Sequence, residues 1–375
     1  MNILLIGPLP PLRGGISDFN YELLKNLVKT QNVQALSFHY LYPKFVFPGK
    51  SQLSKEVPID FKIKKINPYN PLDYINALNQ IRKIKPEKII STHWNPIFSI
   101  SFAILNYLSS NSIEKIGILH NVKSHEPFFL DNLFFRFYYN SLNKAVFLSN
   151  FTKKQVDNLT KINSLSLFHP FPKLNQKLID RNDGLSEKKL DPKKKYLLHF
   201  GIIRKYKGLE ILLKSFKKAL EKNKLIHLII AGEFYENIKK YQKLIDELNI
   251  QNNITIENSF IHESDFFKWF SMADFIIQTN TSATQSGITA LSIYFEKIMI
   301  TTASGCIRET LNKKNSFICK KNTDSISLKI LEACGSNNEK KTNELKKLKK
   351  SLNWDKFSSN LINFIKWKDY FFYQF

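Results

Sequence analysis

A cluster of basic residues lies where a predicted strand gives way to a predicted helix. Arg204, Lys205 and Lys207 follow the apolar run 196–200 and precede a helical pattern that begins at Leu209. Cations at a helix N-terminus oppose the helix dipole, so this arrangement is unfavourable unless an anion lies close by. The segment therefore indicates a diphosphate ligand at Arg204 and Lys207. A solvated basic turn is the alternative interpretation.

A second strand-to-helix turn, near the N-terminus, is rich in glycine and proline. It contains Gly14 and Gly15 just before a helix that begins near Ser17 or Asp18. Paired glycines let backbone amides approach an anion at the positive end of the helix dipole. The spacing is neither GxGxxG nor GxxxxGKS/T, so the standard dinucleotide and P-loop interpretations are disfavoured. A turn without a ligand explains the glycines equally well.

Small polar residues and histidines follow other predicted strands. Residues 279–287 read TNTSATQSG between a strand and a helix, where amides and hydroxyls suit phosphate or sugar oxygens, although such residues also form ordinary helix caps. His93 and His120 follow two predicted strands of the first half. Side chains at the carboxyl ends of such strands project toward the ligand position of an open α/β sheet. A structural role for each histidine is the alternative. The sequence contains no HExxH, GxSxG or Asp-rich pattern, so zinc proteolysis and elbow-type serine hydrolysis have no support.

Short apolar runs alternate with helical patterns, which is typical of parallel strands joined by crossover helices. The predicted strands are 2–6, 34–38, 88–92, 115–119, 144–148 and 164–168, and then 196–200, 225–231, 254–257, 275–278, 298–302 and 316–319. The predicted helices include 18–29, 73–84, 150–159, 209–221, 238–248 and 288–295. The pattern predicts an α/β protein of two doubly wound Rossmann-like domains that face a central cleft.

The same pattern suggests where the domains end. We expect an N-terminal domain over 1–172, a linker over 173–195 where periodicity is lost, and a C-terminal domain over 196–353. The remaining segment, 354–375, holds nine aromatic residues. We expect it to pack back on the N-terminal domain, and contact with a membrane interface is the alternative.

The composition is that of a globular protein with a strong positive charge. The 375 residues include 56 Lys and Arg against 32 Asp and Glu, a net charge of +24, while 43% are hydrophobic, which excludes a disordered chain. The excess is spread out, and residues 251–300 hold two lysines against five acids, so nucleic-acid binding is disfavoured. An anionic membrane surface or merely solvated lysines remain. With no signal-peptide pattern and no long apolar run, we expect a cytoplasmic protein.

Several short motifs occur in order along most of the chain. They are Gly14-Gly15, Tyr42-Pro43 with Phe47-Pro48-Gly49, HNVxxHE at 120–126, FGxIRxYKGL at 200–209, GEFYE at 232–236 and SATQSG at 282–287. Together they resemble a bacterial subgroup of the retaining glycosyltransferases of family 4, which are nucleotide-sugar enzymes with the two-domain GT-B fold.

This resemblance implies roles for individual residues. The catalytic residues would be His120, beside the donor sugar, with Arg204 and Lys207 at the donor diphosphate. The implied donor-binding residues are Gly14, Gly15, Arg204, Lys207, Glu233, Ile261, Thr284, Gln285, Ser286, Gly287 and Ile288. The implied acceptor-side residues are His93, Trp94, Asn121, His125 and Glu126. No metal and no cofactor is implied, since the nucleotide-diphosphate sugar is a co-substrate.

One departure from the family concerns two glutamates that many members carry eight positions apart. This chain has Thr284 and Ser292 there, and we expect the amides and hydroxyls of residues 284–286 to substitute. The resemblance implies sugar transfer with retention to a glycan or lipid-linked acceptor, in bacterial surface polysaccharide synthesis, with peripheral contact to an anionic membrane. The alternative is a catalytically degenerate GT-B protein that binds sugar nucleotides. The nucleotide base, the donor sugar, the acceptor and the oligomeric state stay open.

Overall fold

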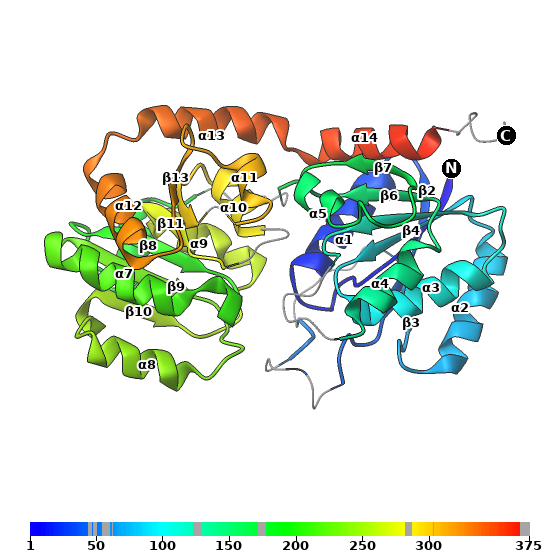
Figure 1. Ribbon diagram of the computed structural model, residues 1–375, viewed down its shortest axis with the longest axis horizontal. Helices are drawn as coiled ribbons and strands as arrows, with labels where there is room; N and C mark the ends of the chain where they lie inside the picture. The colour runs from blue at the N-terminus through cyan, green and yellow to red at the C-terminus, as the bar shows by residue number, and fades with distance from the viewer. Residues whose placement is uncertain are drawn as a thin grey trace. The chain divides into compact units, whose positions relative to one another are not determined.

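The computed structural model describes residues 1–43, 47, 51–54, 61, 63–122, 129–171, 178–281, 287–302 and 304–367 (Figure 1). The chain forms two compact units. Unit 1 comprises Met1–Pro172 and Leu352–Phe375, and unit 2 comprises Lys173–Ser351. Each unit contains one parallel sheet with helices around it, so the predicted pair of Rossmann-like α/β domains is confirmed.

Unit 1 contains a seven-stranded parallel sheet of order β3-β2-β1-β4-β5-β6-β7. Its strands are β1 (Asn2–Ile6), β2 (Asn32–Phe38), β3 (Ile63–Ile66), β4 (Lys88–His93), β5 (Glu114–Leu119), β6 (Lys144–Phe147) and β7 (Asn163–Ser166). The sequence analysis missed β3, because the exposed Lys64 and Lys65 interrupt its apolar pattern. Such lysines are typical of edge strands, where they discourage pairing with another chain.

Helices cover both faces of this sheet. They are α1 (Gly15–Leu27), α2 (Pro71–Ile84), α3 (Ser99–Leu108), α4 (Asp131–Tyr139), α5 (Asn150–Lys154) and α14 (Trp354–Lys366), with the 3₁₀ turn η1 (Pro96–Phe98) before α3. Successive side chains of a strand point to opposite faces. Accordingly Ile3 of β1 lies in the core with α1 and α14, whereas Leu4 lies in the core with α2, α3 and α4.

Helix α14 gives unit 1 part of its core from the far end of the sequence. Its buried residues recur at helical spacing and are Trp354, Phe357, Ser358, Leu361 and Ile365. The ring of Phe19 on α1 lies 5.1 Å from that of Trp354 and 5.8 Å from that of Phe357. The first part of the aromatic segment is thus a core helix.

A buried lysine on β6 holds the last turn of α14. The side chain of Lys144 is 1% exposed, and its Nζ lies 3.0 Å from Oε1 of Glu114. The same Nζ donates hydrogen bonds to the carbonyls of Phe364, at 3.5 Å, and Trp367. Glu114 also pairs with Lys88. Among the described residues, the charge of Lys144 is therefore compensated by Glu114 and by two backbone carbonyls.

Unit 2 repeats the design with a six-stranded parallel sheet of order β10-β9-β8-β11-β12-β13. Its strands are β8 (Lys195–Phe200), β9 (Ile226–Ala231), β10 (Ile254–Glu257), β11 (Phe275–Gln278), β12 (Met299–Thr302) and β13 (Ser316–Cys319). Its helices are α6 (Arg181–Glu187), α7 (Leu209–Lys222), α8 (Ile238–Glu247), α9 (Phe266–Met272), α10 (Gly287–Tyr294), α11 (Ile307–Thr310), α12 (Thr323–Gly335) and α13 (Glu339–Ser351), with the 3₁₀ turns η2 (Lys205–Lys207), η3 (Gln251–Asn253) and η4 (Glu263–Asp265). No helix in the described ranges is both long and apolar enough to cross a bilayer.

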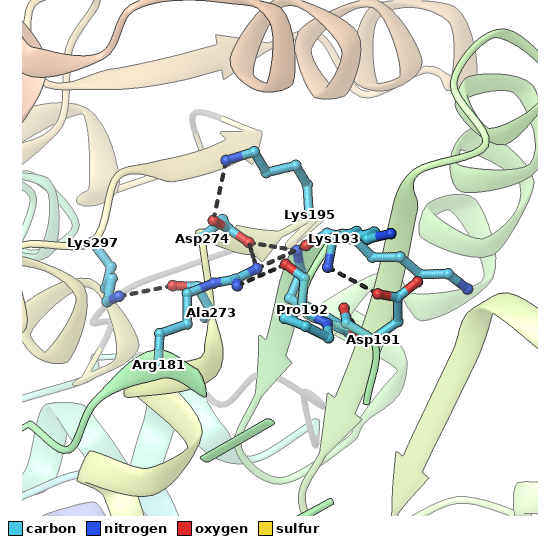
Figure 2. A network of polar contacts seen from close by, with 10 residues as sticks. Arg181, Asp191, Pro192, Lys193, Lys195, Ala273, Asp274 and Lys297 are labelled. Atoms are coloured by element: carbon cyan, nitrogen blue, oxygen red, sulfur yellow. Dashed lines mark hydrogen bonds and ion pairs between the residues drawn. The ribbon is translucent and has the colours of Figure 1, made fainter. Parts of the chain in front are cut away.

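The described part of the expected linker, 178–195, instead belongs to unit 2 and includes helix α6. Figure 2 shows its polar groups converging on Asp274, just before β11. Arg181 donates to Oδ2 of Asp274 at 2.9 Å and to the carbonyl of Lys194 at 2.7 Å. The amide of Tyr196 also donates to Asp274, at 2.8 Å. These bonds fix residues 178–195 to the amino edge of the unit 2 sheet. The sequence analysis missed this order, because the segment has no apolar periodicity.

Both sheets reverse their strand order at one place, between β1 and β4 in unit 1 and between β8 and β11 in unit 2. Crossover connections leave this point on opposite sides of the sheet, so the loops after the two central strands diverge and leave a crevice at the carboxyl edge. Ligands of open α/β sheets bind there. The loops after β1, β4, β8 and β11 are therefore where a site is expected.

Candidate active site

The loop after β8 takes a backbone path that requires glycine at both ends. Gly201 has φ 95° and Gly208 has φ 67°, in the left-handed region that glycine adopts without strain. A Cβ on Gly208 would lie 2.3 Å from the carbonyl oxygen of Thr279, so no side chain fits there. Between these glycines the turn η2 carries Lys205 and Lys207 to the start of α7.

Lys207 is buried, and it has no acidic partner among the residues that the structure describes. Its residue is 7% exposed, and its Nζ lies 3.4 Å from the carbonyl oxygen of Phe200. Burial, together with the nearby positive charge of Arg204, lowers the pKa of Lys207 from 10.5 to about 8. In the part of the chain that the structure describes, no carboxylate forms an ion pair with Lys207 or Arg204. An uncompensated buried ammonium is costly, so this loop favours an anionic ligand.

Arg204 extends from the same loop beside the loop that follows β9. Its guanidinium carbon lies 5.0 Å from the ring centroid of Tyr235. The two loops are joined by backbone hydrogen bonds, from the amide of Ile203 to the carbonyl of Glu233 at 2.9 Å and from the amide of Tyr235 to the carbonyl of Ile203 at 3.0 Å. The buried Glu233 is thereby brought next to residues 201–208, which we call the basic loop, and its donor-binding role stays a prediction.

The loop after β11 holds the basic loop in place. The hydroxyl of Thr279 donates to the carbonyls of Gly208, at 2.9 Å, and Lys207, at 3.2 Å. The amide of Thr281 donates to the carbonyl of Tyr206 at 2.7 Å. The sequence analysis predicted ligand contact for residues 279–287 and missed the positioning role of Thr279 and Thr281. That role depends on the close approach of the loops after β8 and β11, which are far apart in sequence.

Only part of the predicted donor loop lies in the described residues. Thr284, Gln285 and Ser286 fall outside them. Gly287 begins α10, and the Cδ1 atom of Ile288 would lie 3.2 Å from a Cβ on Gly201, so Ile288 adjoins the basic loop. Ser292 is fully buried, and its hydroxyl donates to the carbonyl of Lys297, so it is a structural residue of α10.

Ile261 lies in the loop after β10. It lines a pocket of about 230 Å³ with Trp269 and Glu257, between α6, α9 and the end of β10. Neither Arg204 nor Lys207 lines that pocket. A donor-binding role for Ile261 stays a prediction.

In unit 1 the glycine pair lies at the switch point, as the topology requires. Gly14 has φ 116° and is the N-cap residue of α1, so it has no side chain with which to cap the helix end. Among the described residues, no heavy atom would lie within 4 Å of a Cβ on Gly14 or Gly15. At the base of the loop the side-chain amide of Asn20 donates to the carbonyl of Pro8 and to Thr92, both at 2.8 Å. The glycine pair thus follows a loop that hydrogen bonds fix at its base.

His120 follows β5 and is the most unusual histidine of unit 1. It is 1% exposed, and in the described part of the chain neither of its ring nitrogens has a hydrogen-bond partner. Burial, followed by the effects of His169 and His93, holds its pKa well below the usual 6.5, so the ring is neutral near pH 7. The ring of Phe19 stands edge-on at 4.5 Å, and that of His169 lies 6.1 Å away. A neutral imidazole with free donor and acceptor atoms suits a sugar hydroxyl.

His93 differs from His120 although both end strands. It is fully buried, and its ring nitrogens bond to the carbonyl of Asn121 at 2.9 Å and the hydroxyl of Ser99 at 2.8 Å. It therefore joins the loops after β4 and β5 and has no ring nitrogen left for a ligand. These bonds give His93 a positioning role, and its acceptor-side role stays a prediction.

The other acceptor-side candidates are only partly described. The amide of Asn121 donates to the carbonyl of Trp94 at 3.0 Å, and the Trp94 ring stacks on Phe98 at 4.6 Å. His125 and Glu126 lie outside the described residues. Among the residues that are described, no three His, Cys, Asp or Glu side chains gather as a metal site would require, and metal independence stays a prediction.

Two Rossmann-like units in one chain, each with its polar loops at the switch point, are the GT-B architecture expected from the sequence. Residues 180–353 match the family described as "glycosyl transferases group 1". Unit 2 therefore carries a glycosyltransferase group 1 domain. An uncharacterized glycosyltransferase of Methanocaldococcus jannaschii is 26% identical over 270 residues, which cover 64% of this chain and 62% of that protein. The chain thus spans less than two thirds of that relative.

Solved structures agree with the fold over nearly the whole chain. A glycosyltransferase of Rickettsia africae has a TM-score of 0.74 at 17% identity and covers 97% of this chain and 98% of its own. The HepE protein of Anabaena, in complex with UDP and glucose, has a TM-score of 0.73 at 12% identity and covers 98% of this chain and 100% of its own. The GT-B fold prediction is confirmed.

Proposed function

We propose that the protein is a retaining glycosyltransferase that transfers a sugar from a nucleotide-diphosphate sugar to a glycan or lipid-linked acceptor. The observation that carries the proposal is the buried ammonium of Lys207, which faces no acid in the described residues and lies at the switch point of the unit 2 sheet. A diphosphate would compensate this charge and that of Arg204. The glycosyltransferase group 1 domain over residues 180–353 supports the same ligand class.

In the proposed reaction, negative charge develops on the leaving diphosphate. The bond between the sugar C1 and the phosphate oxygen breaks, and the acceptor oxygen forms the new bond to C1 on the same face. The acceptor proton passes to the leaving phosphate, so the step balances without a paired-carboxylate arrangement. Arg204 and Lys207 stabilise the departing diphosphate, and such preorganised groups contribute most where water is excluded.

His120 contributes on the sugar side in this proposal. Its neutral ring offers one donor and one acceptor to hydroxyls of the donor sugar, and the packing of Phe19 fixes the ring plane. We expect His120→Ala to lower turnover while nucleotide affinity stays unchanged, because the nucleotide itself would be held by unit 2. An equal loss of nucleotide affinity would contradict this division of roles.

Calorimetric titration with UDP, GDP, ADP and CMP tests the proposal directly. UDP comes first, because the HepE structure contains it. We expect one nucleoside diphosphate to bind and the Arg204→Ala/Lys207→Ala variant to lose that binding. Lys205→Ala is the matched control, since Lys205 is exposed on the same turn. A folded protein that binds none of them, or a Lys207→Ala variant with wild-type turnover, would overturn the proposal.

A second candidate is a sugar-nucleotide-binding protein without transferase activity. It is favoured by one observation, the burial of Ser292 at the position of a family glutamate, where its hydroxyl is already bonded within α10. Binding would then persist without chemistry. Hydrolysis or transfer of a sugar from the nucleotide that binds in the titration excludes this candidate.

The acceptor and the cellular role rest on the motif resemblance alone. We propose a lipid-linked or growing surface glycan as acceptor and peripheral contact with an anionic membrane. The net charge of +24 is consistent with such a surface.

A further inference from the structure

A row of exposed apolar side chains runs along α4 and onto the end of α3 in unit 1. We call it the apolar stripe, and its members are Phe129 (82% exposed), Leu133 (60%), Phe137 (46%), Tyr107 (49%) and Leu108 (60%). Single exposed apolar residues are ordinary, but a contiguous row marks an interaction site.

The stripe is contiguous by geometry. Phe129, Leu133 and Phe137 are four residues apart, so they line one side of α4 and its preceding turn. The rings of Phe137 and Tyr107 lie 5.2 Å apart, and the Tyr107 hydroxyl donates to the carbonyl of Phe137 at 3.5 Å. Figure 1 shows α3 and α4 side by side in the same layer. The row therefore continues from one helix to the other.

Cations adjoin the stripe, and exposed acids are absent from the helices that carry it. Arg136 is exposed on α4 between Leu133 and Phe137. A hollow of about 720 Å³ between the ends of α2 and α3 is lined by Tyr107 and Leu108 together with Arg82 and Lys85. In the described ranges 94–113 and 129–143 the only acid is Asp131, which is buried. This side of unit 1 is thus apolar, aromatic and basic.

We propose that the apolar stripe docks unit 1 on an anionic lipid bilayer. Its apolar side chains would enter the headgroup boundary, and Arg82, Lys85 and Arg136 would meet lipid phosphates, which is the combination that interfacial binding requires. A second copy of this chain is a poorer occupant, because two such faces would oppose their cations. The docking gives a surface to the membrane contact of the proposed function and rests on that function for its purpose, which is access to a lipid-linked acceptor.

Sedimentation with lipid vesicles tests the proposal on the full chain. We expect binding to vesicles of phosphatidylcholine with phosphatidylglycerol, weaker binding to phosphatidylcholine alone, and a loss of binding as salt is raised. Leu133→Gln/Phe137→Gln should weaken binding by about tenfold or more, and Arg82→Gln/Lys85→Gln by a similar factor on the anionic vesicles only. The matched control is Leu225→Gln/Leu328→Gln in unit 2, which replaces residues of 57% and 58% exposure and should bind as the wild type does.

The outcomes separate this inference from the proposed function. Wild-type vesicle binding by Leu133→Gln/Phe137→Gln, or no binding by the wild type, overturns the docking surface. A dimer in light scattering that this variant dissociates would assign the stripe to a second copy instead. Nucleotide affinity should be the same in all the stripe variants, so a protein that binds vesicles but no nucleotide refutes the proposed sugar transfer and not the docking surface.

Discussion

Lys144 in unit 1 and Lys207 in unit 2 are both buried at the edge of a sheet, and the two lysines have opposite surroundings. Lys144 lies at the amino edge of the unit 1 sheet, with Glu114 at 3.0 Å and two carbonyls of α14 around its ammonium. Lys207 lies at the carboxyl edge of the unit 2 sheet, with one carbonyl at 3.4 Å and Arg204 as its charged neighbour. Burial alone therefore does not distinguish a structural cation from a binding one.

The difference lies in what compensates the charge. A buried charge whose partners belong to the fold contributes to folding, whereas one without partners lowers stability and is retained for another reason. Lys144 ties a helix to the sheet. In our proposal, Lys207 binds the diphosphate of the donor.

The largest expected effect comes from removing the ammonium of Lys207. Lys207→Met should reduce turnover by about 10²–10³, as for a lost oxyanion donor. The same change should raise the melting temperature of the free protein, because the lowered pKa corresponds to about 3 kcal/mol of unfavourable burial. Turnover assays and thermal unfolding of Lys207→Met and of the exposed control Lys205→Met measure both effects. A lower melting temperature for Lys207→Met would place Lys207 with Lys144 among the structural lysines.

The next-largest effect is expected at Lys144, where removing the ammonium should destabilise the protein. Lys144→Met should lower the free energy of unfolding by about 2 kcal/mol, less than for a fully buried pair, because Glu114 is 23% exposed and retains Lys88. Urea unfolding measures the loss, and Glu114→Gln/Lys144→Met should recover part of it. Nucleotide affinity should not change. A weaker nucleotide affinity in a folded Lys144→Met protein would break the comparison.

The pH dependence of nucleotide binding should also report on Lys207. Its pKa of about 8 in the free protein rises when a diphosphate binds, so affinity is full below pH 8 and falls by up to about tenfold per pH unit above it. The nucleotide phosphates are already ionised there, since their second pKa is about 6. Titrations in buffers of different ionisation enthalpy should show proton uptake on binding near that pH. Lys207→Arg, which stays charged, should show neither effect.

The free protein should show the opposite trend in stability. The pKa of Lys207 is depressed in the folded state, so between about 8 and 10.5 the folded state binds fewer protons than the unfolded state. The contribution of Lys207 to stability therefore becomes less unfavourable as pH rises through that window. The melting temperatures of the wild type and Lys207→Met should converge with rising pH, and a constant difference would argue against the lowered pKa.

The smallest effect concerns the residue that positions the basic loop. Thr279→Val keeps the side-chain shape but removes the hydroxyl bonds to the carbonyls of Lys207 and Gly208, so nucleotide affinity should fall by about threefold to tenfold. Thr279→Ser should restore it. If valine and serine weaken binding equally, packing rather than hydrogen bonding holds the loop.

Strongly patterned elements were predictable from the sequence, and those that depend on distant contacts were not. Strand β9 was predicted within one residue, because all six of its residues are buried and all but His227 are apolar. Helix α6 escaped notice, since its sequence RNDGLSE has no apolar periodicity and its order comes from contacts such as Arg181 with Asp274. Helix α5 ends at Lys154, earlier than the predicted 159, although its N-cap bond from the amide of Thr152 to Ser149 is present.

The same limit applies to the site. The basic loop, the glycine turn and the strand-end histidines were all found from residue type and position. The sequence could not distinguish His93 from His120, because the difference lies in the bonds that Ser99 and Asn121 make to His93. The burial of Lys207 was equally hidden, since it depends on packing among loops that are remote in sequence.

The late position of α14 in the chain sets an order of synthesis. Most of unit 1 is synthesised before unit 2, but the core of unit 1 is incomplete until Trp354 and Phe357 have been made. Unit 2 is contiguous, so all of its described strands emerge before α14 does. A nascent chain therefore has every part of unit 2 available while the apolar side of α1 still lacks its cover, and chaperone contact with the growing polypeptide should concentrate on the N-terminal unit.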